Sequence, residues 1–294
     1  MVATANCSWA HVAPPFEEEA LVTDFTAFGS MERRGWSDVR RASDYVELFA
    51  FASDQAIDSL LDAVGAKTGS KTLDLCCGQG NVSEKLISRG CHVTGIDFSP
   101  AMLAFARDRN PKGTFIEADA QNLPFSEAEF DIVVSNFGVC HVPDQPRVLA
   151  EVRRVLRPGG SFAMTVWCGQ ETSPCFALVY GAIKTHGSHG VTAPEGPDFH
   201  QFAKPDMAKA LLSATGFSSV DVSVVDCAWH LNAPEDLFTI YSKGTVRAAM
   251  LLSHQPQENL AAIESALAQA VRERFSDGDV WRVPVPAALV RATA

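Results

Sequence analysis

The sequence predicts an α/β fold whose centre is a doubly wound, mostly parallel sheet of seven strands. Two observations support this prediction. Between residues 71 and 168, five short β-rich runs alternate with helical runs, an arrangement that implies right-handed crossovers between parallel strands. Two more strand patterns follow later in the chain, at residues 218–229 and 283–293. A chain of 294 residues suits one large domain with an appended lid better than two independent domains.

The N-terminal part, residues 1–42, shows no sustained hydrophobic period, and we expect it to form a tail or flexible lid. From Ser43 onward, apolar residues recur at the spacing of a helix, which predicts one or two helices that end at Gly65. The predicted core therefore spans residues 43–168.

Within this core, Ser99 is the expected N-cap of a helix, and Pro100 occupies its first position. Another helix is stopped by Pro158 and Gly159. The expected helices after Gly65 cover residues 81–90, 100–109 and 145–156. The expected strands cover residues 71–77, 91–98, 113–119, 130–137 and 160–168.

The second half of the chain divides into four expected parts. Residues 169–204 lack a regular pattern and are predicted to be an insertion over the site. Residues 205–227 supply a helix and a strand that complete the core, and residues 228–276 form a helical lid insertion with amphipathic runs at 235–252 and 256–275. Residues 277–294 hold the last core strand.

Composition excludes several classes of function. The formal net charge of −11 argues against a nucleic-acid partner, because coating phosphates requires a basic surface. The eight cysteines show no paired C-x-x-C spacing, which indicates a protein of the reducing cytoplasm. Six of them follow or lie among strand-like apolar residues and are expected to be buried thiols. The sequence shows neither a leader pattern nor an apolar run of membrane-spanning length, so no membrane partner is expected.

A glycine-rich turn, LDLCCGQGN at residues 73–81, joins the first core strand to the helix after it. Gly78 and Gly80 let the backbone approach a ligand closely, although a tight turn requires glycine for steric reasons alone. Asp97 ends the second strand 17 residues after Gly80, where its carboxylate can accept hydrogen bonds from both ribose hydroxyls. Asp119 and Ala120 end the third strand and can meet an adenine edge. Three strand ends thus converge on one adenosine.

These motifs occur in a characteristic order: LDLCCGQGN, VTGIDFSPAML, EADAQNLPF, FDIVVSNFGVCHV and VLRPGG. The series resembles that of class I S-adenosylmethionine-dependent methyltransferases, most closely the ubiquinone/menaquinone-biosynthesis-like group that modifies small molecules. The resemblance covers roughly residues 70–168, about a third of the chain. It implies a Rossmann-like fold, the cofactor S-adenosyl-L-methionine and the product S-adenosyl-L-homocysteine.

The resemblance also implies roles for individual residues in the cofactor site. Asp97 would bind the ribose, and Asn136 would border the methionine part. Cys76 stands where the family most often has its first glycine, so Cys76 and Cys77 are either inert small residues or reactive thiols. The full predicted cofactor site consists of Asp74, Cys76, Gly78, Gly80, Asp97, Phe98, Met102, Asp119, Ala120 and Asn136.

Methyl transfer from a sulfonium is an in-line displacement, so the protein mainly positions the reactants and needs a base only for some acceptors. His141 and Tyr180 are the candidate catalytic residues, although His141 would also suit a structural role. His186, His189 and His200 match no standard ligand spacing and are expected to be solvated loop residues. No metal is therefore expected.

Aromatic residues outside the motifs predict an apolar acceptor pocket, although packing within the lid would explain any one of them. The predicted pocket consists of Trp36, Tyr45, Trp167, Phe176 and Tyr180. The wider aromatic set adds Phe199, Trp229, Phe238, Tyr241 and Trp281.

The function expected from these features is methyl transfer to O, N or C of a small hydrophobic or aromatic metabolite, in biosynthesis or other small-molecule metabolism. Two alternatives remain open. One is a use of the cofactor for cyclisation, elimination or attack on another of its carbons, and the other is a cofactor-sensing scaffold. The expected oligomeric state is a monomer or a homodimer.

Overall fold

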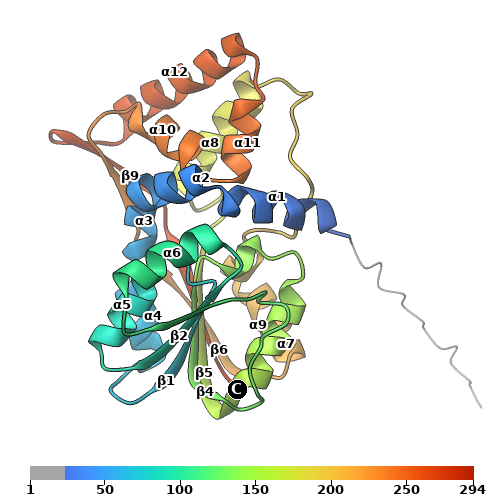
Figure 1. Ribbon diagram of the computed structural model, residues 1–294. Coiled ribbons are helices and arrows are strands. Elements are labelled where there is room, and N and C mark those ends of the chain that lie inside the picture. Colours follow the sequence, from blue (N-terminus) through green and yellow to red (C-terminus); the bar gives the residue numbers. More distant parts are fainter. Residues whose placement is uncertain (1–23) are drawn as a thin grey trace, which may run out of the picture.

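The computed structural model describes residues 24–294, in which seven strands form one large sheet in the lower half of Figure 1. The strands are β1 (Lys71–Leu75), β2 (His92–Asp97), β3 (Thr114–Glu117), β4 (Phe130–Asn136), β5 (Leu156–Trp167), β6 (Ser218–Val225) and β10 (Ala287–Thr293). Their spatial order is β3-β2-β1-β4-β5-β10-β6. β10 runs antiparallel to β5 and β6, whereas the other neighbours are parallel. The predicted mostly parallel, seven-stranded sheet is confirmed.

Helices cover both faces of this sheet, as expected for a doubly wound fold (Figure 1). On one face, apolar residues of α4 (Ile57–Ala63) and α5 (Asn81–Ser88) pack against β2, β4 and β5. On the other face, α7 (Gln145–Val155) and α9 (Pro205–Ala214) close a larger cluster around Phe130 and Phe162. Ser99 caps α6 (Pro100–Arg109) by accepting a hydrogen bond from the Met102 backbone N–H, as the sequence predicts.

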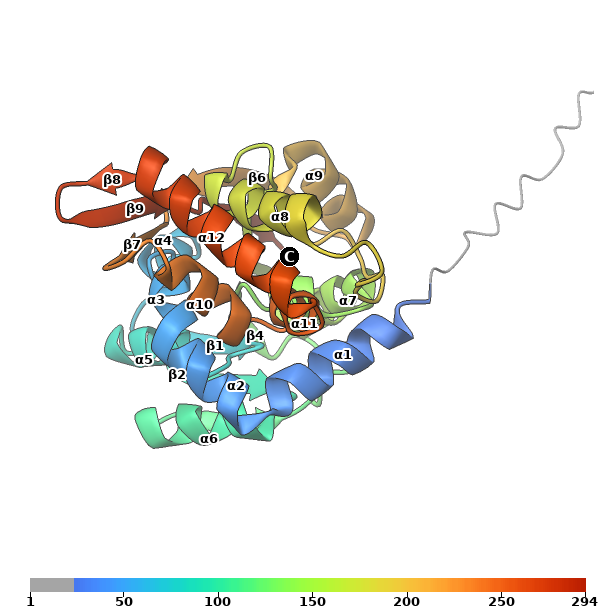
Figure 2. The same cartoon turned by 90° about the horizontal axis from the view of Figure 1, so that it is seen from above.

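A second layer lies above the carboxyl ends of the strands and forms the upper half of Figure 1. Its helices are α8 (Pro174–His186), α10 (Asp236–Lys243), α11 (Arg247–Ser253) and α12 (Gln257–Arg274). A small antiparallel sheet, in the order β7-β9-β8, joins them and consists of β7 (Ala228–Leu231), β8 (Ser276–Asp277) and β9 (Val280–Pro284). Figure 2 shows the hairpin of β8 and β9 projecting beyond α12. Buried Trp229 and Tyr241 centre the apolar core of this layer, and Phe238 and Trp281 pack against it.

The N-terminal part was expected to be a tail or a flexible lid, and the tail is wrong for residues 24–42, which are mostly helical. Residues 1–23 of this prediction lie outside the described residues. Helix α1 (Thr26–Ser37) crosses the space between the two layers (Figure 1). The sequence pattern does not reveal this helix, because two of its positions are the poor helix formers Gly29 and Gly35. Both stand where α1 closely approaches other elements. A Cβ on Gly35 would lie 2.5 Å from a Val246 methyl group, and one on Gly29 would lie 3.0 Å from Pro143 Cγ. After α1 come α2 (Val39–Asp44), a π-helical turn η1 (Tyr45–Phe49) and α3 (Ala50–Asp54).

The insertion at residues 169–204 is also more regular than expected. Helix α8 begins at Pro174, and the Ser173 hydroxyl caps it by accepting from the Phe176 backbone N–H. This Ser-Pro start is a helix signal that the loose apolar pattern around it conceals. An irregular stretch then leads to the short 3₁₀ turn η3 (Gln201–Ala203).

The single strand expected over residues 218–229 is in fact two strands that enter different sheets. β6 pairs with β10 in the large sheet, and β7 pairs with β9 in the small one. The last segment of the chain also divides between the two sheets, since β9 lies in the small sheet and only β10 joins the large one. Across residues 24–294, no helix combines the length and the apolar character that a membrane crossing requires.

Candidate active site

The main cavity, of about 410 Å³, lies where the carboxyl ends of β1, β2 and β4 meet the upper layer. A second cavity of about 250 Å³ adjoins it beneath α1. Both are lined by Glu32, Cys76, Asp97, Phe98 and His141. The two spaces therefore form one site that joins the predicted cofactor residues to the lid.

The glycine-rich turn after β1 has the backbone that the sequence predicts, with one unusual member. Gly78 and Gly80 have φ of +52° and +80°, and Cys76 has φ of +57° without being glycine. No atom lies within 4 Å of where a Gly78 Cβ would be, which leaves room for a ligand. Gly80 lines neither cavity, and its Cβ would lie 2.6 Å from Asn110 Nδ2. Gly80 thus allows the tight turn, while Gly78 leaves space for a ligand beside it.

Cys76 and Cys77 have the properties of unreactive thiols. Burial raises the pKa of both well above the usual value, so both remain protonated. The strained Cys76 backbone faces Gly138, whose Cβ would lie 2.3 Å from that of Cys76. This close approach favours the inert interpretation, in which Cys76 is a small residue that fits the turn. Within the described chain all seven cysteines are free, and all except Cys76 are fully buried.

Asp97 ends β2 as a buried carboxylate held by two backbone donors. Its Oδ2 accepts from Gly78 N–H and its Oδ1 from Ser99 N–H, both at 2.9 Å. Burial raises its pKa, and these hydrogen bonds oppose that effect. Asp74 lies deeper, where burial raises its pKa to about 7 even though the Ser83 hydroxyl donates to it at 2.6 Å. Asp97 is therefore fixed with its remaining lone pairs free for a ligand, while Asp74 supports the turn.

The second cavity contains the residues predicted to meet adenine. Phe98, Asp119 and Ala120 line it together with residues of α1. Arg33 of α1 forms a 3.0 Å ion pair with Asp119, and its guanidinium lies 5.0 Å from the centre of the Phe98 ring. Helix α1 thus covers this cavity, and its Arg33 contacts Asp119 and Phe98. Met102 lines the main cavity instead.

The main cavity also contains a polar pair that the sequence did not reveal. Asn81 Nδ2 donates to both carboxylate oxygens of Asp54, at 2.7 and 2.8 Å. Asn81 Oδ1 is buried and has no hydrogen-bond partner in residues 24–294. Both side chains line the main cavity, so an ammonium group would supply the missing donor. The pair therefore fits the amino group of S-adenosylmethionine, and no sequence motif marks Asp54.

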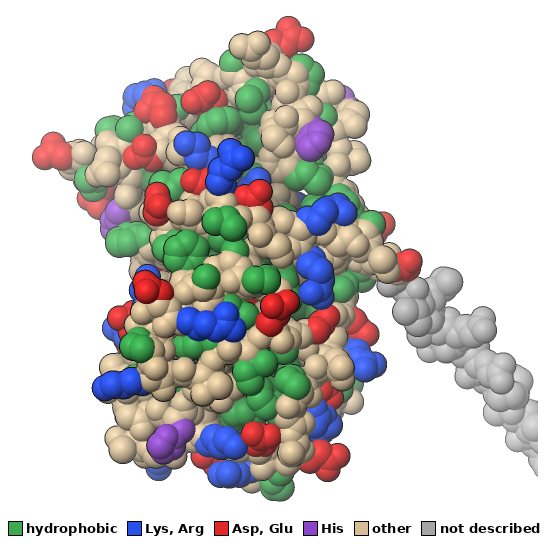
Figure 3. Space-filling view, in the orientation of Figure 1, with side chains coloured by type: hydrophobic (Ala, Val, Ile, Leu, Met, Phe, Trp, Pro, Cys, Tyr) green, Lys and Arg blue, Asp and Glu red, His purple; other side chains and the backbone are tan. Residues whose placement is uncertain are grey.

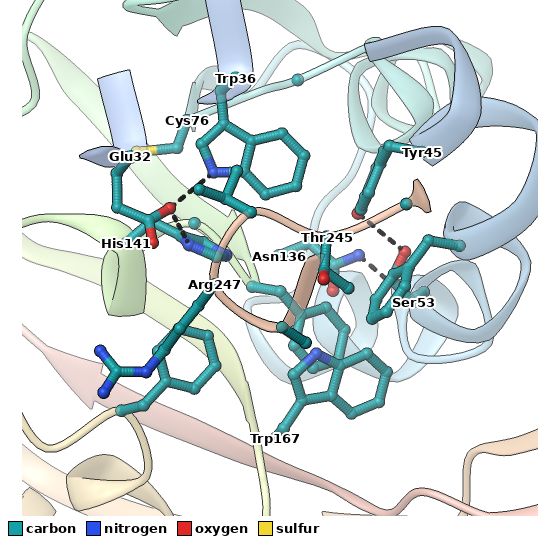
Figure 4. Close-up of a pocket in the computed structure, with 18 of the residues that line it drawn as sticks. Glu32, Trp36, Tyr45, Ser53, Cys76, Asn136, His141, Trp167, Thr245 and Arg247 are labelled. Carbon is teal, nitrogen blue, oxygen red and sulfur yellow. Dashed lines mark hydrogen bonds and ion pairs between the residues drawn. The ribbon is translucent and has the colours of Figure 1, made fainter. Parts of the chain in front are cut away.

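Asn136 lines the same cavity, but its amide is already engaged. Its Nδ2 donates to Ser53 O at 3.1 Å, and its Oδ1 accepts from the Thr165 hydroxyl at 2.6 Å. Figure 4 shows Asn136 close to Ser53 and Tyr45 in the cavity wall. Asn136 thus fastens the end of β4 to the N-terminal helices beside the expected methionine part.

His141 follows β4 in the short turn η2 (Val139–His141) and contacts a carboxylate that the sequence did not reveal. Its Nδ1 lies 2.9 Å from Glu32 Oε2, and the Trp36 indole N–H donates to the same oxygen at 2.9 Å (Figure 4). Burial alone would lower the pKa of His141, but its neighbours Cys140 and Glu32 together hold it well above the usual value. At neutral pH the two residues therefore form an ion pair, with Nε2 of His141 left for a ligand.

The predicted acceptor residues all line the main cavity, and further aromatic rings complete its wall. Phe137 and Trp167 stack with centroids 3.8 Å apart, and Phe176 stacks on Tyr180 at 5.9 Å. Burial raises the pKa of Tyr180 to about 12, so its hydroxyl donates rather than acts as a base. The full aromatic lining consists of Phe28, Trp36, Tyr45, Phe49, Phe98, Phe137, Trp167, Phe176, Tyr180, Phe199 and Tyr241.

The histidines of the insertion do not share one environment. His186 and His189 are exposed, as expected, but His200 lines the main cavity and its Nδ1 lies 2.8 Å from the Trp167 carbonyl oxygen. The solvated position expected for His200 is therefore wrong, because η3 turns it back toward β5. A search of residues 24–294 finds no group of three His, Cys, Asp or Glu side chains that could hold a metal ion.

Comparison with known proteins supports the family resemblance that the motifs indicate. Residues 73–164 match the protein family described as "Methyltransferase domain". The demethylmenaquinone methyltransferase of Staphylococcus carnosus is 31% identical over 179 residues, which cover 55% of this chain and 74% of the relative. The chain belongs to the class I S-adenosylmethionine-dependent methyltransferases. Family membership brings S-adenosylmethionine as the cofactor and S-adenosylhomocysteine as its product.

A second relative shows how far the likeness extends. The demethylmenaquinone methyltransferase of Beutenbergia cavernae is 38% identical over 121 residues, which cover 41% of this methyltransferase and 50% of the relative. The chain therefore spans about half the length of such relatives. Among solved structures, the YcgJ protein of Bacillus subtilis superposes with a TM-score of 0.54 at 16% identity over 81% of this chain and 97% of its own. That likeness confirms the fold alone.

Proposed function

We propose that this methyltransferase transfers the methyl group of S-adenosylmethionine to O, N or C of a small, hydrophobic or aromatic acceptor. The observation that carries this proposal is the shared cavity. The cofactor residues Gly78, Asp97 and Met102 and the aromatic rings of the lid line one continuous space. The reacting groups would thus meet inside the protein, where water is largely excluded.

The proposed cofactor position follows from the donors and acceptors of the site. Asp54 and Asn81 would hold the methionine ammonium, Asp97 would hold the ribose hydroxyls, and Phe98 would border the adenine. Trp167 and His141 would then border the space in which the methyl group is transferred. Aromatic faces also attract a cation, which favours the charged cofactor over its neutral product. The cofactor supplies the electrophilic methyl group, and the protein residues orient it.

His141 is the proposed residue that meets the acceptor. Its Nδ1 is held by Glu32, and its Nε2 borders the cavity that both substrates would share. When protonated, Nε2 donates a hydrogen bond to an acceptor oxygen. Once the pH exceeds its raised pKa, Nε2 can instead take a proton from a hydroxyl or an amine. Tyr180, whose hydroxyl stays protonated, is proposed as a donor only.

The acceptor class is proposed from the shape and chemistry of the wall. Stacked and edge-on rings suit a planar molecule, and the names of the two quoted relatives point to a quinone-derived acceptor. The stretch between α8 and η3 and the helices α10 and α11 would form the roof of this acceptor site. The domain boundaries predicted from the sequence are retained as proposals, with α1 as the lid within residues 1–42.

Calorimetry with the purified protein tests cofactor binding. We expect S-adenosylhomocysteine to bind, Asp97→Ala to weaken binding by at least about tenfold, and the exposed β6 variant Asp221→Ala to bind as the wild type does. Absent binding, or equal binding by Asp97→Ala, would refute the proposal. Mass spectrometry of products then separates the chemistries. An acceptor heavier by one methylene unit supports transfer, and an isomer or a cofactor-derived ring supports the alternative use of the cofactor.

A further inference from the structure

A cationic side chain lines the acceptor part of the main cavity without a carboxylate partner. Arg247 begins α11 and is half-buried among the aromatic rings. Its Nη1 donates to the Pro194 carbonyl at 2.9 Å, and no carboxylate of residues 24–294 forms an ion pair with it. The other N–H groups of its guanidinium make no hydrogen bond within these residues. A guanidinium held by one such hydrogen bond keeps further N–H donors for a ligand.

The acidic residues of the cavity do not neutralise this charge. Glu32 is already paired with His141 and accepts from Trp36. Glu195 follows Pro194 and lines the cavity, but it is exposed and is not within ion-pair distance of Arg247. Because Glu32 is engaged by His141, Arg247 is a lining cation with which no carboxylate of residues 24–294 forms an ion pair.

A second donor lines the same cavity. The hydroxyl of Tyr180 has no hydrogen-bond partner among the described residues, and the positive charge of Arg247 acts on it. Tyr180 is stacked on Phe176, so the ring that bears this donor is fixed. Figure 4 shows Arg247 on the same side of the cavity as Glu32 and His141, with Tyr45 and Ser53 on the other side.

We propose that Arg247 and Tyr180 form an anion subsite, and that the acceptor is a planar apolar molecule that carries a carboxylate or another anionic oxygen group. This inference rests on the proposed function and narrows its acceptor class. A carboxylate accepts charge-assisted hydrogen bonds from a guanidinium and a phenol, while its ring lies against Phe176 and Phe199. A quinone-derived acceptor fits this subsite only if it carries such a group, so the inference narrows the proposed acceptor class to anionic members.

Arg247 could also act only as a staple, because it ties α11 to the stretch that contains Pro194. Arg41 provides a matched control. It donates to the Lys243 and Thr245 carbonyls of the neighbouring turn and does not line the cavity. Arg41 is therefore a staple in the same region without access to a ligand.

The test uses the full-length protein saturated with S-adenosylhomocysteine and two probes of equal shape, 2-naphthoate and its neutral amide 2-naphthamide. We expect the wild type to bind the carboxylate about 10- to 100-fold more tightly than the amide, as for a charge-assisted hydrogen bond in a partly buried site. Arg247→Gln should abolish this preference, Arg247→Lys should keep part of it, and Tyr180→Phe should reduce it several-fold. Arg41→Gln should leave it unchanged.

Four outcomes would overturn the anion subsite. Two concern the wild type: it binds both probes equally, or it binds neither. Two concern Arg247→Gln: the preference for the carboxylate survives, or the affinity for both probes falls equally, which would mark Arg247 as a staple. Affinity for S-adenosylhomocysteine is measured on every variant and shows that the fold and the cofactor site are intact. Failure of the proposed function would instead appear as lost cofactor binding or as unmethylated products, independently of the preference between the probes.

Discussion

The ion pair between Glu32 and His141 gives a prediction that joins stability to pH. Glu32→Gln removes the charge and keeps the size of the side chain. The Glu32 side chain is only 2% exposed, that of His141 is 24% exposed, and the two atoms in contact lie 2.9 Å apart. Because solvent screens this pair poorly, we expect it to contribute more than a surface ion pair does.

A hydrogen bond to a charged group contributes about 1.5–3 kcal/mol, so we expect Glu32→Gln to lower the free energy of unfolding by about 2 kcal/mol near pH 6. For a chain of this size, that corresponds to roughly 4 °C in melting temperature. The folded state raises the pKa of His141. The contribution is therefore complete below the unfolded value of about 6.5 and disappears as the pH rises through the folded pKa. The effect of the substitution should shrink in alkaline buffer.

Thermal and urea denaturation at pH 6 and at an alkaline pH measure this difference. Glu235→Gln is the control, because Glu235 forms a 2.7 Å ion pair with Arg272 in which both side chains are about half exposed. We expect that control to change stability by less than about 1 kcal/mol at either pH. An effect of Glu32→Gln that is as small as the control, or that stays constant with pH, would refute the ion pair. If His141 also serves as a base, the rise of kcat/KM with pH should move to lower pH in Glu32→Gln.

Three further predictions concern the turn, helix α1 and the cofactor site. Cys76→Gly relieves a left-handed backbone and should raise the free energy of unfolding by up to about 1 kcal/mol without changing affinity for S-adenosylhomocysteine; lower stability or weaker binding would contradict this. Gly35→Ala forces a Cβ to within 2.5 Å of Val246 and should destabilise by about 1–3 kcal/mol. Gly181→Ala in α8 is the control, because a Cβ there would meet no atom within 4 Å, and it should stabilise the protein slightly in the same thermal denaturation experiment. Equal effects of Gly35→Ala and Gly181→Ala would count against close packing of α1. Asn81→Ala should weaken S-adenosylhomocysteine roughly tenfold in calorimetry, and unchanged affinity would remove Asn81 from the cofactor site.

The parts of the fold that follow from local pattern were predictable. Alternating strands and helices, with caps such as Ser99 and turns such as that at Gly78, specify the parallel core within a short stretch of sequence. The ends of those strands also place Asp97 and Asp119 correctly near the two cavities. Local periodicity therefore predicted the sheet and brought together the residues that are proposed to bind adenosine.

The residues that the sequence analysis missed depend on contacts across long stretches of chain. Glu32 meets His141 across 109 positions, and Arg33 meets Asp119 across 86. Helix α1 was missed because Gly35 lowers its helical propensity while serving a contact with Val246. Arg247 likewise follows no motif, since only the folding of α11 over the sheet brings it into the cavity. Tertiary packing, rather than propensity, decided each of these positions.

Helix α1 presents two neighbouring residues to different halves of the site. Glu32 orients His141 on the acceptor side, and Arg33 holds Asp119 on the cofactor side. A displacement of α1 that opens the second cavity for the exchange of spent cofactor must therefore also release His141. The proposed catalytic arrangement is complete only while the helix is docked, and the Ser99 hydroxyl donates to the Trp36 carbonyl at 2.7 Å to hold it there. Turnover would then depend on the rate at which this helix undocks and returns, as in enzymes whose slow step is product release.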